Sequence, residues 1–92
     1  MGISETLKAI SDPVRREIME MIKYEKKTAG DIAAQFKLTN ATVSYHLSVL
    51  KNAGLIAETR YKKYIYYELN VSVFEELLIW IKSLGGENNE KN

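Results

Sequence analysis

The sequence contains no cysteine, which excludes disulfide bonds, thiolate metal sites and thiol catalysis. It contains one histidine, His46, whereas an ordinary metal site needs roughly four ligands. Its longest apolar run, residues 77–81, is far shorter than the roughly 20 residues that span a membrane. Glu5 and Lys8 interrupt the stretch that comes nearest to a signal peptide. We therefore expect a cytoplasmic protein with no membrane insertion, no metal site and no cofactor.

The chain has 92 residues, of which 46% are hydrophobic, and this is enough for one domain with its own core. We expect residues 1–86 to form this domain, with Gly85 and Gly86 ending its last helix. The polar residues 87–92 are expected to form a flexible, frayed tail. Because the sequence has no nucleophile–base pair, ligand cluster or glycine-rich phosphate loop, an enzyme is not expected.

Residues 28–54 have the pattern of two short helices joined by a tight connection. The first helix is predicted over residues 31–36. The second is predicted to begin at Asn40, after Thr39 as its N-cap, and to end before Gly54, which suits a left-handed position. Its apolar residues recur at the spacing of a helix that is buried on one side: Val43, Leu47 and Leu50.

The opposite face of this second helix carries no acidic residue, which is unusual for a face that only contacts water. Short amide and hydroxyl side chains suit the major groove of DNA, where they meet the edges of bases. The pattern therefore predicts the recognition helix of a helix-turn-helix. We predict base contacts from Asn40, Ala41, Thr42, Ser44 and Tyr45.

Residues 55–69 alternate apolar and polar side chains, which is typical of a half-buried β-hairpin. The basic residues Arg60, Lys62 and Lys63 fall at its tip, where a wing would reach the DNA backbone or the minor groove. A basic tip that only contacts water is the simpler alternative, but beside this helix face we favour the wing. The residues predicted to face inward are Ile56, Ile65, Tyr67 and Leu69.

The net charge of +1 is unevenly distributed, because residues 37–67 contain five basic residues and one acid, Glu58. This local excess is enough for contacts to phosphates on one face of a nearly neutral molecule. We expect His46 to be half-buried and to anchor the helix, donating to the backbone or to a phosphate. The predicted phosphate contacts are Lys37, His46, Lys51, Arg60, Lys62 and Lys63.

Two helices are predicted before residue 28. Residues 4–10 form the first, with Ser4 as its cap, and Asp12 with Pro13 begins the second, which extends to about Tyr24. The first turn of the second helix carries Arg15 and Arg16, which either contact water or bind a phosphate or an acidic neighbour. The side chains predicted to be buried in the second helix are Val14, Ile18, Met21 and Ile22.

A last helix is predicted from Ser72, with Glu75 completing a capping box. Its apolar residues extend around most of its circumference, more than a small domain can cover. We therefore expect the first and last helices to pack against a second copy of the chain. The predicted dimer interface consists of Ile3, Leu7, Ile10, Phe74, Leu77, Leu78, Trp80, Ile81 and Leu84.

Residues 5–69 resemble the ArsR/SmtB-type winged-helix repressors. The resemblance rests on LKAISDPVRREI at residues 7–18, on residues 28–36, on TNATVSYHLSVLKNAG at residues 39–54 and on IYYEL at residues 65–69. It implies a mainly α-helical fold with a small β-hairpin, a symmetric homodimer and binding of an inverted repeat at a promoter. It also implies base contacts at the positions named above.

The chain departs from this family in three places. Residues 29–32 lack the cysteines of the founding sensor motif, and residues 72–84 lack the Asp and His of the other metal-binding members. Lys62 stands where the wing turn usually has glycine, so a turn of different shape or size is expected. Without either metal site, the chain most resembles the metal-independent branch of SdpR-like autorepressors. This resemblance leaves three possibilities for release from DNA: a regulatory protein partner, a small-molecule inducer, or no known signal.

The leading hypothesis is a dimeric repressor that binds double-stranded promoter DNA and acts by occupying it. The alternative is a winged-helix protein-interaction module without DNA binding, which is suggested by the exposure expected for Ile79 and Trp80. Replacing Ser44 and Tyr45 with Glu would distinguish the two.

Overall fold

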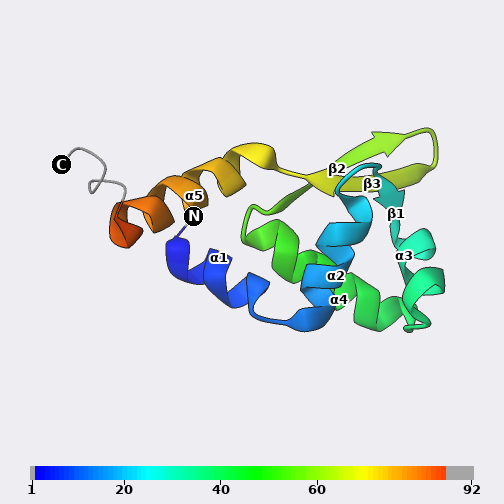
Figure 1. Cartoon of the computed structure of the whole chain (residues 1–92). Helices are drawn as coiled ribbons and strands as arrows, with labels where there is room; N and C mark the ends of the chain where they lie inside the picture. Colours follow the sequence, from blue (N-terminus) through cyan, green and yellow to red (C-terminus); the bar gives the residue numbers. More distant parts are fainter. Residues whose placement is uncertain (1, 87–92) are drawn as a thin grey trace.

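The computed structural model describes residues 2–86, and the tail predicted for residues 87–92 lies outside them (Figure 1). The helices within the described residues are α1 (Ile3–Ile10), α2 (Pro13–Ile22), α3 (Ala29–Phe36), α4 (Asn40–Asn52) and α5 (Val71–Gly85). The strands there are β1 (Lys27–Thr28), β2 (Ile56–Tyr61) and β3 (Tyr64–Leu69). They form an antiparallel sheet in the order β1-β3-β2. The predicted architecture, mainly α with a small hairpin, is confirmed.

The core lies where α2, α3 and α4 meet the first residues of the hairpin. The inward face predicted for α4 is confirmed, because Val43, Leu47 and Leu50 are all buried. In α2, Met19 is buried, whereas Val14 and Met21, which were predicted to be buried, are only partly covered. The fully buried side chains with the largest volumes are Ile18, Ile22, Ile32, Leu50, Leu55 and Val43.

Three predicted boundaries are confirmed by their capping contacts. Asp12 Oδ1 accepts hydrogen bonds from the backbone N–H of Val14 at 2.8 Å and of Arg15 at 3.2 Å, which fixes the start of α2. Thr39 Oγ1 accepts from the N–H of Thr42 at 3.1 Å and begins α4. Gly54 has a φ of 78°, the left-handed conformation predicted where α4 ends.

Two predicted caps are wrong. The N-cap of α1 is Gly2 rather than Ser4, and the side chain of Glu5 accepts from its N–H at 3.3 Å. The N-cap of α5 is Asn70, without a side-chain cap, because the Ser72 hydroxyl instead donates to Asn70 Oδ1 at 2.9 Å. In both places the N-cap lies two residues earlier along the chain than the predicted cap.

Two further boundaries differ from the prediction. Helix α2 ends at Ile22, not near residue 24. Helix α3 begins at Ala29, since Thr28 Oγ1 accepts from the N–H of Asp31 at 3.1 Å while Asp31 accepts from the N–H of Thr28. The two residues before α3, Lys27 and Thr28, form β1 and pair with β3, where Lys27 is opposite Tyr67. A strand of two residues has no periodicity that could reveal it.

The hairpin turn also differs from the prediction. Tyr61 pairs with Tyr64, so the turn consists of Lys62 and Lys63. Lys62 has a φ of 56°, which is the left-handed conformation that favours glycine. The turn therefore keeps this backbone shape without glycine, at a cost of about 1 kcal/mol.

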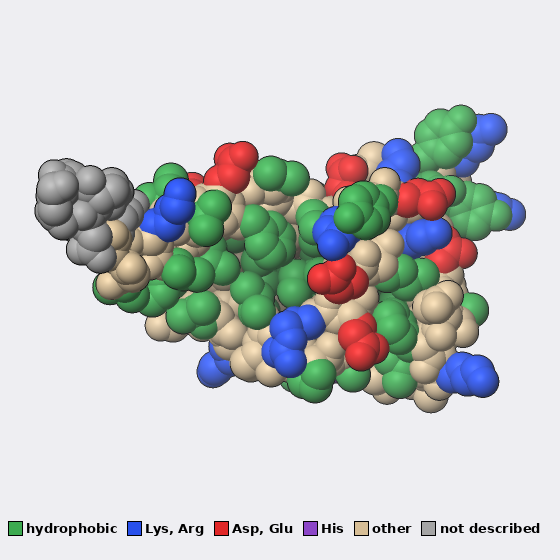
Figure 2. Space-filling view, viewed as in Figure 1, with side chains coloured by type: hydrophobic (Ala, Val, Ile, Leu, Met, Phe, Trp, Pro, Cys, Tyr) green, Lys and Arg blue, Asp and Glu red, His purple; other side chains and the backbone are tan. Residues whose placement is uncertain are grey.

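Helices α1 and α5 lie beside each other and extend away from the sheet (Figure 1). The side chain of Val73 is buried, but most of the apolar residues of α5 are not covered. Figure 2 shows hydrophobic side chains gathered over this end of the molecule. Within the described residues, no helix is long and apolar enough to cross a membrane.

Candidate DNA-binding surface

Helix α4 presents the uncharged face that its sequence predicts. Asn40, Ala41, Ser44 and Tyr45 are all exposed, with 62% of Tyr45 accessible to solvent. Thr42 is half-buried, and its hydroxyl oxygen lies 2.9 Å from that of Thr39 within the cap. The first two turns of α4 therefore offer one amide, two hydroxyls and a small side chain to a partner.

The predicted basic residues of the wing are also exposed. The ammonium groups of Lys62 and Lys63 lie 5.4 Å and 5.7 Å from the ring centres of Tyr61 and Tyr64, respectively. Such contacts restrain flexible lysines near an aromatic ring without neutralising their charge. Figure 2 shows basic and hydrophobic side chains projecting together at the hairpin end.

Lys37 ends α3 and is exposed beside the connection to α4. Its φ of 57° is left-handed, as is common at the end of a helix. Residues 37–39 alone connect α3 to α4, so this basic residue lies near the start of the recognition helix.

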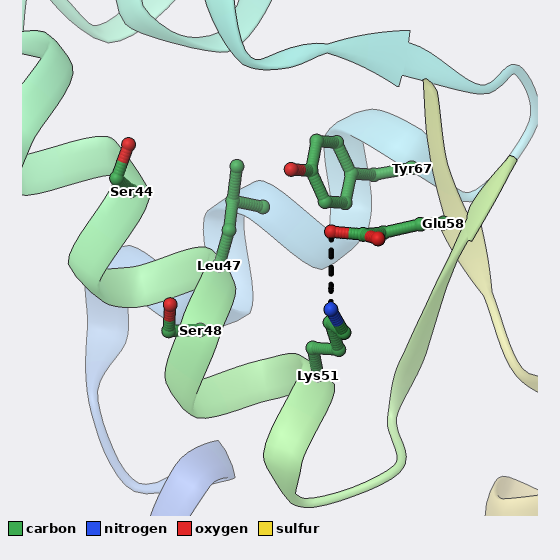
Figure 3. Close-up of a pocket in the computed structure, with 6 residues that line it drawn as sticks. All are labelled: Ser44, Leu47, Ser48, Lys51, Glu58 and Tyr67. Atoms are coloured by element: carbon green, nitrogen blue, oxygen red, sulfur yellow. Dashed lines mark ion pairs between the residues drawn. The ribbon is translucent and has the colours of Figure 1, made fainter. Parts of the chain in front are cut away.

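A cleft of about 210 Å³ separates the recognition helix from the hairpin (Figure 3). Lys51 Nζ, at the end of α4, lies 3.2 Å from Glu58 Oε2 on β2. Burial and the neighbouring Glu58 carboxylate raise the pKa of Tyr67 on β3. The cleft is lined by Ser44, Leu47, Ser48, Lys51, Glu58 and Tyr67.

Arg15 and His46 form a contact that the sequence analysis did not predict. Only 8% of each residue is exposed, and Arg15 Nη1 lies 3.2 Å from His46 Nδ1. Arg15 Nε also donates to the carbonyl oxygen of Ala9 at 2.7 Å, and Nη2 donates to that of Lys8 at 3.3 Å. Arg15 therefore joins the end of α1 to α4, and its Nη1 also lies 4.0 Å from Asp12 Oδ2, the kind of acidic neighbour that one of its two alternatives named.

This contact changes the expectation for His46. The ring faces Arg15 inside the domain, so it anchors α4 as expected, but burial argues against a phosphate contact. The predicted phosphate contact of His46 is therefore not part of the proposed DNA interface. No group of three or more His, Cys, Asp or Glu side chains within residues 2–86 is placed to bind a metal ion.

A helix-turn-helix with an uncharged exposed face, followed by a basic hairpin, defines a winged helix-turn-helix DNA-binding protein. The family model described as "Bacterial regulatory protein, arsR family" matches residues 12–58. The chain belongs to this family. It is accordingly a DNA-binding transcriptional regulator and not an enzyme.

Individual proteins agree with this assignment. The chain is 40% identical over 79 residues to the transcriptional repressor SdpR of Bacillus subtilis, covering 86% of this chain and 88% of SdpR. An ArsR-like regulator from Rhodococcus has the same fold, with a TM-score of 0.84, 19% identity and coverage of 96% and 83%. So does the homodimeric winged helix-turn-helix DNA-binding domain of a Mycobacterium bovis protein, with a TM-score of 0.75, 21% identity and coverage of 92% and 79%.

Proposed function

We propose that the chain is a homodimeric repressor that binds an inverted repeat in promoter DNA in the bacterial cytoplasm. The observation that carries this proposal is the uncharged, exposed face of α4 above a fully buried apolar face. Base readout comes from this face, with Asn40, Ser44 and Tyr45 as hydrogen-bonding groups and Ala41 allowing close approach. Thr42 lies beside them at the start of the helix and contributes through the cap.

Contacts to phosphates position the helix on DNA and come from the residues around it. The basic groups of the wing, Arg60, Lys62 and Lys63, contact the backbone on one side, and Lys37 contacts it near the start of α4. Lys51 is paired with Glu58 in the free protein, so its contact requires that this pair opens. Because these contacts release counterions, affinity should fall with salt at a log–log slope of about −0.9 for each neutralised phosphate.

The dimer forms through α1 and α5. Ile3, Leu7, Leu78, Ile81 and Leu84 are all exposed in the single chain, and clustered exposed apolar side chains mark a surface that binds another protein chain. Trp80 is also exposed, whereas Ile10, Phe74 and Leu77 are partly covered and border the same surface. A twofold axis there would present two recognition helices to successive turns of DNA.

A gel-shift assay on the DNA upstream of the chain's own gene tests the proposal. A retarded band is expected at low salt, and replacement of Ser44 and Tyr45 with Glu should abolish it while leaving the dimer intact. This promoter is the target to test first, because the chain resembles the SdpR-like autorepressors and is 40% identical to SdpR. No band for the purified dimer at low salt would contradict DNA binding.

The interaction-module alternative, which exposed Ile79 and Trp80 on α5 suggested, is not favoured, because the chain belongs to a family of DNA-binding regulators. It predicts that the Ser44 and Tyr45 variants keep their cellular effect. A regulatory protein or a small molecule that releases the repressor would act through the α1 and α5 surface, since changes there alter the spacing of the two recognition helices.

A further inference from the structure

The cleft between α4 and the hairpin contains an acidic side chain on a surface that is otherwise neutral or basic. Glu58 is the one acid in residues 37–67, and its carboxylate forms the 3.2 Å ion pair with Lys51. Half of the Lys51 side chain and 37% of the Glu58 side chain are exposed. An ion pair at this exposure contributes about 0–1 kcal/mol to stability, so stability is a weak reason for an acid at this place.

The elements around this pair fix its position. Ser44, Ser48 and Lys51 follow one stripe of α4 that is turned toward the hairpin (Figure 3). Glu58 and Tyr67 are directly opposite each other on β2 and β3, with their side chains toward α4 (Figure 3). The carboxylate therefore approaches Lys51 from the wing side of the cleft.

The proposed DNA complex places a sugar-phosphate backbone at this cleft. A recognition helix occupies the major groove and the tip of the wing reaches the adjacent minor groove, and one backbone separates two adjacent grooves. Phosphates on that backbone would meet the hydroxyl of Ser48, the ammonium of Lys51 and the carboxylate of Glu58. Two of these three groups attract a phosphate, and the carboxylate repels it.

We propose that Glu58 is a specificity-determining residue whose carboxylate binds Lys51 in place of a DNA phosphate. The inference rests on the proposed function. On DNA of unrelated sequence the pair stays closed, so Lys51 adds no affinity although the backbone lies within its reach. On the operator, a phosphate displaces the carboxylate and takes over Lys51. Glu58 therefore weakens binding to unrelated DNA more than binding to the operator.

The test compares Glu58→Gln with Glu68→Gln. Both variants remove one negative charge from the hairpin, but Glu68 pairs with Ala57 and follows Tyr67, so its side chain points away from the cleft. Fluorescence anisotropy with a mixed-sequence duplex and with the upstream promoter fragment, over a series of salt concentrations, gives the affinities. Thermal unfolding of each variant verifies that it is folded.

We expect Glu58→Gln to bind the mixed-sequence duplex up to about fivefold more tightly at low salt, since the pair no longer has to open, with a slope steeper by about 0.9. Its gain on the promoter fragment should be smaller, so that the ratio of the two affinities falls. Glu68→Gln should change the affinity less than about threefold without a steeper slope, because only long-range charge is removed. Adding Lys51→Met to Glu58→Gln should cancel the gain.

Three results would overturn the inference or its basis. Equal effects of the two Gln variants would mean that Glu58 acts only through its long-range charge, and the proposed function would be unaffected. Weaker binding by Glu58→Gln would show that the pair instead holds the hairpin against α4, again without affecting the proposed function. Failure of the unmodified protein to bind either DNA would remove the proposed function itself.

Discussion

Arg15 is a charged side chain that the fold buries, and burial of a guanidinium is favourable only when its donors are occupied. Its partners are the carbonyl oxygens of Ala9 and Lys8 and a ring nitrogen of His46, and Asp12 Oδ2 lies 4.0 Å away. The residue therefore links the connection between α1 and α2 to the recognition helix. Neighbouring Arg16 donates to the carbonyl oxygen of Ile10 at 2.8 Å, but this contact is exposed.

Replacing Arg15 with Met should lower the free energy of unfolding by about 2–4 kcal/mol, since buried acceptors lose a charged donor. Replacing Arg16 with Met removes the same charge and should cost less than about 1 kcal/mol, because water can replace an exposed donor. Urea unfolding followed by circular dichroism measures both. Equal losses would mean that the Arg15 contacts contribute no more than a surface interaction.

Asp12 makes stability depend on pH. Burial raises its pKa, but hydrogen bonds from the N–H groups of Arg15 and Val14 and the nearby charge of Arg15 outweigh burial, so the pKa lies below its ordinary value. A carboxyl group with a lower pKa in the folded state stabilises that state above its unfolded pKa. This contribution is lost as the pH falls through the folded pKa.

The variant Asp12→Asn keeps a capping acceptor but cannot ionise. The unmodified protein should therefore be the more stable of the two at neutral pH, and the difference should shrink as the solution is acidified below about pH 4, where free carboxyl groups titrate. Urea unfolding at several pH values measures the difference. A constant difference across this range would contradict the assigned role of the charge.

At the scale of elements, the sequence predicted the helices and the hairpin wherever periodicity was strong. The apolar spacing of Val43, Leu47 and Leu50 is a local property and identified both faces of α4. The contact between Arg15 and His46 could not be predicted in this way, because it joins residues 31 positions apart and depends on how α2 packs on α4. The signal that was present is the unusual placement of arginine at a helix start, where it opposes the helix dipole.

The shape of the hairpin turn was predicted wrongly, although the rule behind the prediction holds. The sequence rule states that a non-glycine residue is strained at positive φ, and Lys62 nevertheless adopts a φ of 56°. The pairing of β2 with β3 over six residue pairs from Ile56–Leu69 to Tyr61–Tyr64 imposes the turn, and the strand pairing outweighs the strain. The tip of the wing therefore carries a basic side chain at a position where glycine would relieve the backbone strain.

Replacing Lys62 with Gly should therefore stabilise the protein by about 0.5–1 kcal/mol while weakening its binding to DNA. Lys63, which does not have a positive φ, is the matched control: its replacement with Gly should destabilise the fold by a similar amount. Thermal unfolding and fluorescence anisotropy on the same samples measure both effects. Destabilisation by both replacements would show that the turn at Lys62 is not strained.

At the scale of the whole molecule, one end bears the wing and the start of α4, and the other bears α1 and α5 (Figure 1). The apolar side chains of α5 extend around most of its circumference, and the core covers few of them. DNA readout and assembly therefore occupy separate surfaces. A change at the assembly end should act on DNA affinity through the number of helices presented and not through the contacts of each helix.

The variant Ile81→Glu tests this separation. Ile81 is 48% exposed in the single chain, and a carboxylate there would have to be buried in the dimer, so the variant should be monomeric in analytical ultracentrifugation. Loss of the second recognition helix should weaken promoter binding by about 100-fold or more, because the two half-sites no longer bind together. Tyr24→Glu, two residues beyond the end of α2 and at a tyrosine that is 89% exposed, should leave both the dimer and the affinity nearly unchanged. A dimeric Ile81→Glu variant, or a monomer that keeps full affinity, would mean that α5 does not bring the two recognition helices together.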